Sequence, residues 1–139
     1  MLKIELLDWP AAQAEAKRIR FTVFVEEQRV PPELEMDDED ARCTHAIAYA
    51  EGKAVGTGRL LPDGHIGRMA VLKDWRGRGA GRALLRALIE AARRRGDSEV
   101  ALNSQVQALG FYRAEGFEPE GAVYEEAGIP HQAMRLKLR

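Results

Sequence analysis

Three glycines lie close together at positions 77, 79 and 81, and three arginines stand beside them. Glycine permits positive φ angles and lets backbone N–H groups approach a ligand closely. A strongly helical stretch follows, and a helix N-terminus offers unpaired N–H donors and a positive dipole. The pattern predicts a phosphate or pyrophosphate site, because a merely flexible turn would not require the arginines. The residues concerned are Arg76, Gly77, Arg78, Gly79, Ala80, Gly81 and Arg82.

Two common nucleotide-binding motifs do not fit this segment. A nucleoside-triphosphate P-loop needs Lys followed by Ser or Thr after its last glycine, and neither follows Gly81. A dinucleotide motif needs G-x-G-x-x-G directly after a strand and an acidic residue at the end of the next strand. Here the spacing is G-x-G-x-G, four residues separate Leu72 from Gly77, and Asn103 occupies the strand end.

Residues suited to metal binding or hydrolysis are not arranged in known motifs. Cys43 and His45 are two positions apart, but no second pair stands at ligand spacing. Ser98, Ser104 and Cys43 lack a nucleophile motif such as G-x-S-x-G. We therefore expect no bound metal and no hydrolytic triad.

Charge is unevenly distributed, although the net charge is only −1. The segment Glu26–Asp40 holds eight acids and one base, Arg29, whereas Arg68–Arg95 holds nine bases and only Asp74 and Glu90 as acids. The basic segment is expected to meet an anion. The acidic segment either meets a cation or is a solvated loop.

The 139 residues suffice for one domain with its own core. No apolar run approaches the ~20 residues of a membrane span, and the first residues lack the apolar core of a signal peptide. The single cysteine, Cys43, suits a reducing compartment. We therefore expect one domain over residues 1–139, located in the cytoplasm.

Hydrophobic periodicity predicts an order of elements in which strands and helices are interspersed. A first helix is expected to start near Pro10 and to continue through Phe24, before a loop over Glu33–Arg42. Two further helices are expected at Gly81–Arg95 and Val106–Arg113. The expected strands are Leu2–Leu6, Thr44–Ala50, Ala54–Leu61, Ile66–Leu72, Glu99–Asn103, Gly121–Glu125 and Gln132–Leu138.

Arg76-x-x-Gly79-x-Gly81 matches the R/Q-x-x-G-x-G/A signature of the GCN5-related N-acetyltransferases, the GNAT superfamily. The resemblance covers nearly the whole chain. Ile66–Val71 stands where the family has its cofactor-facing strand, and Phe111-Tyr112 followed by Gly116-Phe117 resembles its helix and turn. The ElaA/YjcF-like branch is the most similar, through the segments Arg20–Gln28, Leu102–Ala108 and Glu126–His131.

The resemblance implies an α/β GNAT-like domain, with a mixed, mostly antiparallel sheet of about six or seven strands and helices on both faces. It implies direct transfer of an acetyl group from acetyl-CoA to an acceptor amine. Arg76–Arg82 would hold the pyrophosphate, and Met69, Ala70 and Val71 would pair with the pantetheine arm. Asn103 would add a polar contact, or alternatively cap the helix that follows.

For catalysis, the resemblance makes Tyr112 the candidate acid that protonates the leaving thiolate. The base is less clear. Glu27 and its neighbour Glu26 lie beside the acidic segment, and Glu27 could act through a water. His131 has a suitable ordinary pKa of ~6.5, but it shares strand parity with Arg135, away from the most apolar face. A local hydrogen-bonding role is its alternative.

Several alternatives stay open at this point. Arg59 and Arg68 either recognise an acidic acceptor or flank the sheet. The acceptor is a small molecule or, alternatively, a protein, and a homodimer is possible. A non-catalytic module that binds acyl-CoA is the second functional class. Nucleic-acid binding through the arginine-rich helix is disfavoured, because no aromatic residues are interleaved with its arginines.

Overall fold

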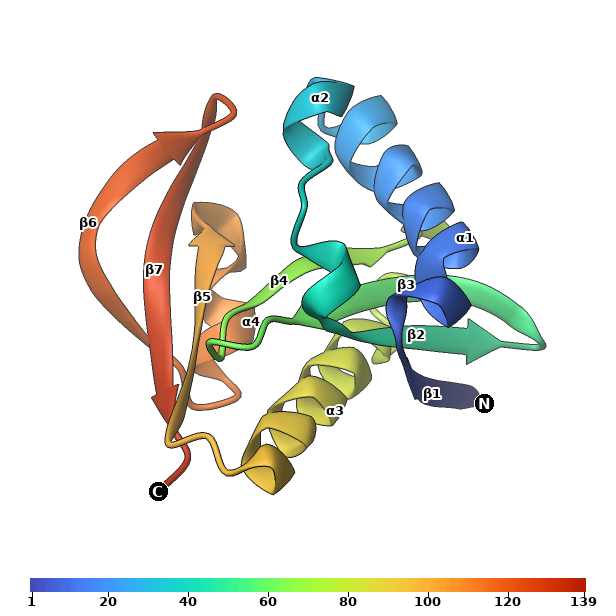
Figure 1. The fold of residues 1–139 in the computed structure, drawn as a ribbon. Helices are drawn as coiled ribbons and strands as arrows, with labels where there is room; N and C mark the ends of the chain where they lie inside the picture. The colour runs from blue at the N-terminus through green and yellow to red at the C-terminus, as the bar shows by residue number, and fades with distance from the viewer.

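The computed structural model describes residues 1–139 and contains seven strands in two sheets (Figure 1). The helical elements are α1 (Trp9–Arg20), the π-helix η1 (Phe21–Glu27), α2 (Pro32–Glu35), η2 (Asp40–Arg42), η3 (Lys73–Trp75), α3 (Ala80–Arg95), η4 (Val106–Ala108) and α4 (Leu109–Arg113). The strands are β1 (Leu2–Leu7), β2 (Thr44–Ala50), β3 (Lys53–Leu60), β4 (Ile66–Val71), β5 (Glu99–Gln105), β6 (Glu118–Glu126) and β7 (Ile129–Lys137).

The two sheets meet only where β4 and β5 begin. One sheet has the antiparallel order β1-β2-β3-β4 and the other the antiparallel order β5-β7-β6. A parallel bridge joins His65 to Ala101, whose N–H donates to the Gly64 carbonyl at 3.1 Å. Gly64 has φ +92°, and a Cβ there would lie 3.0 Å from the Glu99 carbonyl oxygen. Beyond this seam β4 and β5 do not pair with each other, although β4 pairs with β3 and β5 with β7.

A bulge in β4 bends that strand. Its pairing with β3 shifts between Thr57, which faces Ala70, and Arg59, which faces Gly67. Arg68 lies in the interval with φ +49°, the left-handed region that non-glycine residues rarely adopt. Bulges of this kind bend a strand and redirect its side chains. Here the bulge lies in the part of β4 that is not paired with β5.

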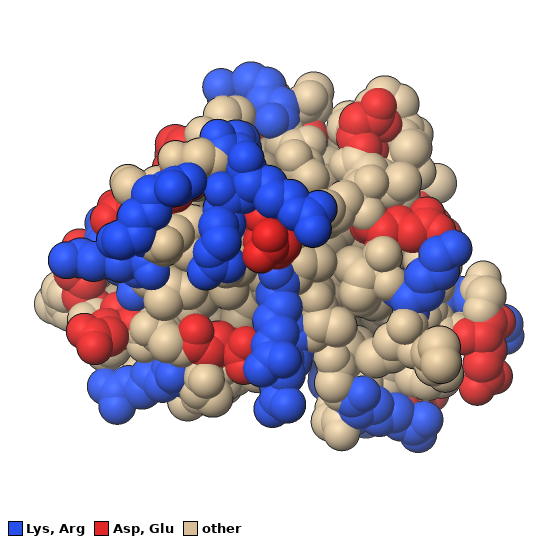
Figure 2. Space-filling view, turned by 90° about the horizontal axis from the view of Figure 1, so that it is seen from below, with Lys and Arg blue, Asp and Glu red and all other residues tan.

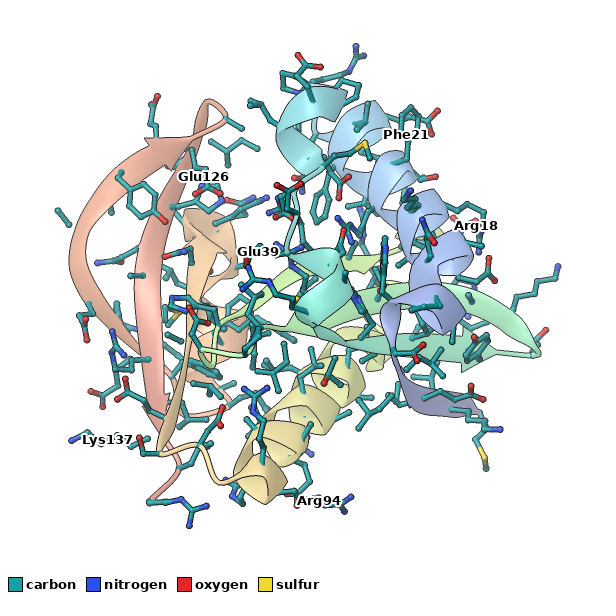
Figure 3. All side chains as sticks on the ribbon, viewed as in Figure 1. Arg18, Phe21, Glu39, Arg94, Glu126 and Lys137 are labelled. Carbon is teal, nitrogen blue, oxygen red and sulfur yellow. The ribbon has the colours of Figure 1, made fainter.

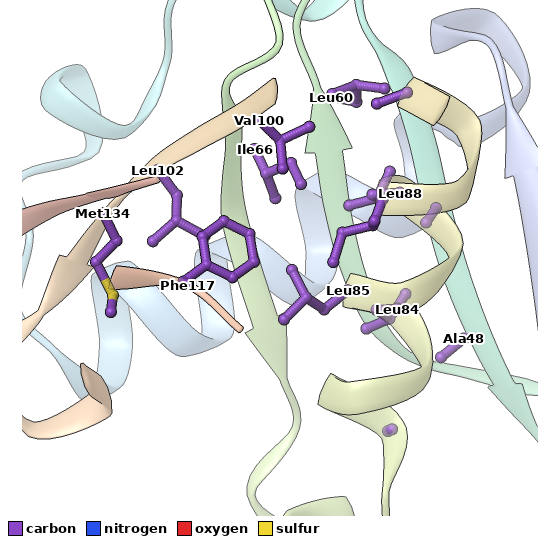
Figure 4. Packing of buried hydrophobic residues seen from close by; sticks show 14 of the residues in the cluster. Ala48, Leu60, Ile66, Leu84, Leu85, Leu88, Val100, Leu102, Phe117 and Met134 are labelled. Carbon is purple, nitrogen blue, oxygen red and sulfur yellow. The ribbon is translucent and has the colours of Figure 1, made fainter. Parts of the chain in front are cut away.

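Helices cover both faces of the first sheet. The apolar stripe of α3 packs on one face, where Leu84, Leu85 and Leu88 are fully buried. Figure 4 shows Phe117 between the leucines of α3 and the side chains of Leu102 and Met134. The opposite face packs against α1 in a second cluster. The predicted helix Gly81–Arg95 is confirmed to within one residue, as is the α/β fold class with helices on both faces.

Three sequence-based expectations need correction. The helix predicted to end near Phe24 continues as a π-helix to Glu27. The acidic loop Glu33–Arg42 contains α2 and η2. The strand expected from Gly121 begins at Glu118, because β6 is an edge strand where Pro119 needs no ladder hydrogen bond and where a bulge accommodates extra residues.

Candidate active site

A cleft of about 740 Å³ opens where β4 and β5 part. Its walls come from both sheets, from η1 and α2, and from the end of the β6–β7 hairpin. Of the residues predicted from sequence, the cleft brings together Met69, Ala70, Val71, Arg76, Asn103, Tyr112 and His131. Glu27 and the segment Gly77–Arg82 lie outside its lining. The predicted site residues therefore gather around one opening, but not all of them face it.

The glycine-rich turn leads directly into α3. Gly77 has φ +75° and Gly79 has φ +89°, and an added Cβ at either position would meet no atom within 4 Å. The first N–H groups of a helix have no partner within the helix. The N-terminus of α3 has no side-chain cap either, so no side chain satisfies these donors. Arg78 stacks over Trp75 at 4.9 Å. The turn thus presents unpaired donors and positive charge to open space.

Gly81 has a different role from the other two glycines. Its φ is not positive, and a Cβ there would lie 3.4 Å from the ring of Phe111 and 3.9 Å from Val71. The missing side chain allows close packing between α3 and α4, where a Cβ would be in ordinary van der Waals contact. A side chain larger than Ala at Gly81 would disturb this packing.

Glu27 contacts Arg76, which lines the cleft. Its carboxylate accepts a hydrogen bond from Arg76 Nη2 at 2.9 Å, while Arg76 Nε donates to the Val71 carbonyl at 2.9 Å. The two contacts fix the Arg76 guanidinium beside the end of β4. Glu27 itself does not line the cleft and is connected to it through Arg76. A role as the base would require Glu27 to lie beside the acceptor.

Tyr112 forms part of the wall between β4 and β5. Its ring packs edge-on against Phe111 and Phe117, with centroid distances of 5.0 Å and 6.0 Å. Burial raises the pKa of Tyr112 to about 12. The hydroxyl therefore keeps its proton at any physiological pH and can act as a hydrogen-bond donor.

His131 is buried, although it belongs to neither hydrophobic core cluster. It is 8% exposed, its ring stacks on Tyr124 at 6.0 Å, and it lines the cleft. Its Nδ1 lies 2.7 Å from the Ile129 carbonyl oxygen. Because a carbonyl only accepts, Nδ1 carries the hydrogen, and the neutral ring keeps a lone pair on Nε2. His131 is covered in part by Tyr124, its cross-strand neighbour on β6.

Asn103 is exposed at the end of β5 and lines the cleft. The capping alternative is wrong, since η4 begins after Gln105 and neither η4 nor α4 has a side-chain cap.

A hydrogen bond between two glutamine side chains joins the two sides of the cleft. Gln105 Nε2 donates to Gln28 Oε1 at 2.9 Å, which links the end of β5 to the end of η1.

The acidic segment meets cations, and these are the protein's own arginines. Asp40 accepts hydrogen bonds from Arg20 at 2.9 and 3.1 Å and from Arg59 at 2.9 Å. Burial alone would raise the pKa of Asp40, but these bonds outweigh it and hold the pKa below its ordinary value. Hydrogen bonds from Arg59 lower the pKa of Asp37 to about 2. This network was missed because its members are distant in sequence.

The basic face of the molecule is broken by acids. Figure 2 shows Lys and Arg side chains on the face seen from below, with Asp and Glu side chains among them. On α3, Arg86 bonds Glu115 at 2.7 Å and Arg94 bonds Glu90 at 3.2 Å.

No helix is long and apolar enough to cross a membrane. No group of three or more His, Cys, Asp or Glu side chains is arranged to hold a metal ion.

A family model described as an acetyltransferase (GNAT) domain matches residues 10–138. The chain therefore belongs to the GNAT acetyltransferase family. The prediction of this family from the sequence is confirmed. Membership makes the protein an acyltransferase that uses acyl-CoA.

Individual GNAT relatives are similar over most of the chain. The uncharacterized N-acetyltransferase YjcF of Bacillus subtilis is 39% identical over 120 residues, covering 84% of this chain and 86% of that protein. The crystal structure of Escherichia coli ElaA has a TM-score of 0.87 at 28% identity, covering 99% of this chain and 100% of ElaA. An acyl-CoA N-acyltransferase from Pseudomonas aeruginosa has a TM-score of 0.83 at 30% identity, covering 98% and 99%.

Proposed function

We propose that this GNAT domain, residues 1–139, transfers an acetyl group from acetyl-CoA to the amine of a small-molecule acceptor, by direct attack while both are bound. The observation that carries the proposal is one cleft whose lining includes Arg76, Tyr112 and His131. The uncapped N-terminus of α3 follows Arg76 along the chain and lies outside this lining.

The turn between η3 and α3 fits a pyrophosphate. The open space at Gly77 and Gly79 would be filled by any Cβ, and the first N–H donors of α3 have no partner. Acetyl-CoA supplies a thioester whose acyl group passes to the attacking nitrogen. Met69, Ala70 and Val71 line the cleft beside the turn and would hold the pantetheine arm by backbone hydrogen bonds.

Two side chains in the cleft serve the reaction, one by taking a proton and one by stabilising the leaving thiolate. His131 Nε2 has the free lone pair needed to take a proton from the acceptor ammonium, directly or through a water. Tyr112 donates a hydrogen bond to the sulfur as the C–S bond breaks. Its pKa of about 12 exceeds that of a thiol, ~8.5, so the hydroxyl stabilises the thiolate without giving up its proton.

Release of free thiol tests the proposed function. The purified protein is incubated with acetyl-CoA and a panel of amines, and CoA release is followed with a thiol reagent. We expect amine-dependent release and an acetylated amine by mass spectrometry. Tight binding of acetyl-CoA without release for any amine would instead indicate the non-catalytic acyl-CoA-binding module.

Substitution of Gly79 by Val is expected to weaken CoA binding by about tenfold or more, because the side chain would occupy the space before the α3 donors. Isothermal calorimetry measures the affinity. Gly52→Val is the matched control, since Gly52 has φ +79° and equally open surroundings in the β2–β3 turn. Both variants carry similar backbone strain. Equal CoA affinity in the two variants would remove the phosphate site from the turn.

Substitution of Glu27 by Gln is expected to raise the KM for acetyl-CoA by up to about fivefold, because a partly exposed ion pair contributes ~1 kcal/mol or less. Glu27 pairs with Arg76, so Arg76→Gln serves as the comparison. In the double variant, Glu27→Gln should raise the KM for acetyl-CoA little beyond that of Arg76→Gln alone. Steady-state kinetics at saturating substrates give the second readout. A tenfold fall in kcat would instead make Glu27 part of proton removal.

A further inference from the structure

Arg59 holds a buried donor that nothing in the chain satisfies. The residue is 5% exposed and lines the cleft. Its Nη1 donates to Asp37 and to Asp40, both at 2.9 Å, and its Nη2 donates to Asp37 at 2.6 Å. Its Nε is buried and has no hydrogen-bond partner. Orphaned buried N–H groups are rare in proteins because they cost free energy. The orphan points to a ligand that accepts a hydrogen bond.

Arg68 is also incompletely paired. Its Nε donates to the Glu35 carbonyl and its Nη2 to Asp37, both at 3.2 Å, and the side chain is 26% exposed. A guanidinium has five N–H donors, so these two bonds leave Arg68 with further capacity. Burial lowers the pKa of Arg68, and repulsion from Arg59 lowers it further. An anion beside Arg68 would oppose both effects, because a neighbouring negative charge favours the charged guanidinium.

Space for such a group exists beside the two arginines. Gly67 is the strand partner of Arg59, so the two positions face the same side of the sheet. A Cβ on Gly67 would meet no atom within 4 Å, and Gly67 lines the cleft together with Arg59 and Arg68. The three residues thus form one open corner at the β4 bulge.

The opposite wall carries groups that suit an amine. Glu126, near the end of β6 (Figure 3), and His131 both line the cleft. Glu35 also lines it, but its carboxylate is taken by a buried ion pair with Arg20. A bound amine is therefore left with the hairpin wall. The β4 wall offers N–H groups of Arg59 and Arg68 that make no hydrogen bond, although both guanidinium groups are ion-paired to acids. The two walls have opposite chemistry.

We propose that the acceptor is an amine that also carries an anionic group, a carboxylate or a phosphate, and that this group binds Arg68 and Arg59 Nε in the corner at Gly67. The inference rests on the proposed function, because it names the class of amine used at the same site. Charge-assisted hydrogen bonds to a guanidinium are strong and directional. They hold the amine end of the acceptor toward the hairpin wall.

Matched pairs of amines test the proposal. L-amino acids are compared with their primary amides for the carboxylate, and O-phosphoethanolamine with ethanolamine for the phosphate. We expect kcat/KM for one anionic series to exceed that of its neutral partners by about tenfold or more. Equal rates within every pair overturn the inference while the proposed function stands.

Variants locate the effect at the corner. Arg68→Gln should abolish the preference for the anionic partner and leave CoA affinity unchanged, and Arg68→Lys should restore part of it. Gly67→Val fills the open space at a position without positive φ. It should lower kcat/KM for the anionic amines selectively. Arg94→Gln is the control, because Arg94 is 77% exposed and lies on α3. A preference that survives Arg68→Gln overturns the assignment.

Binding separates the two possible failures. If no amine releases thiol, the proposed function fails, and the same pairs are titrated by calorimetry into protein saturated with CoA. Selective binding of the anionic members, lost in Arg68→Gln, supports the corner site even then. Binding of neither member, or of both equally, overturns it.

Discussion

Tyr112→Phe is expected to lower kcat by about 10²- to 10⁴-fold, the usual effect of removing a positioned donor to a developing charge. The substitution keeps the ring and its edge-on contacts with Phe111 and Phe117, so the fold should be retained. The KM for acetyl-CoA should change far less, because the hydroxyl acts mainly in the transition state. Steady-state kinetics with a turned-over amine measure both constants.

Tyr49→Phe is the matched control, because Tyr49 lies on β2 outside the cleft. The pH profile adds a second test. Since burial raises the pKa of Tyr112 to about 12, the donor stays protonated through pH 10, and no loss of kcat from its ionisation is expected below that pH. A kcat for Tyr112→Phe within about threefold of wild type would make Tyr112 a packing residue.

Asp40→Ala is expected to destabilise the protein by about 3 kcal/mol, near the lower end of the cost of breaking a buried ion pair, because Arg20 keeps Glu35 and Arg59 keeps Asp37. Arg20 and Arg59 are 2% and 5% exposed, and both donate to Asp40. Urea denaturation measures the free energy of unfolding. Glu90→Ala should cost about 1 kcal/mol or less, because its arginine partners are exposed. A loss below about 1 kcal/mol for Asp40→Ala would show that the network is not a source of stability.

The same network predicts acid sensitivity. Asp37 and Asp40 have folded pKa values below the ordinary ~3.9. Their contribution to stability is complete above about pH 4 and is lost as the pH falls toward about 2, the pKa of Asp37. Asp40→Ala should therefore show a weaker fall in stability over this range than wild type.

Elements with strong local signals could be predicted from the sequence. The helix α3 has an uninterrupted apolar stripe and ends at Gly96, which adopts the left-handed conformation with φ +94°. The glycine-rich turn likewise depends on neighbouring residues. In contrast, α2 is only four residues long and carries no apolar face. Its position is fixed by the ion pair of Glu35 with Arg20, a contact between distant segments.

The candidate site divides in the same way. Tyr112 and the β4 residues follow motifs that are local, and their lining of the cleft could be anticipated. Glu27 could not be placed, because its partner Arg76 is 49 positions away in the sequence. Alternation places His131 opposite the apolar residues of β7, but it could not show that His131 is buried, because its covering neighbour Tyr124 comes from β6.

The angle between the two sheets depends on what is missing at Gly64. Its Cα approaches the β5 backbone so closely that a methyl group would press on the Glu99 carbonyl oxygen at 3.0 Å. Any side chain there would push β4 and β5 apart at the seam where the two sheets join. A shift of a few tenths of an ångström at the seam becomes larger toward the open end of the cleft, because that end lies farther from the seam. A side chain at Gly64 is therefore expected to change the width of the opening between β4 and β5 from a position outside the cleft lining.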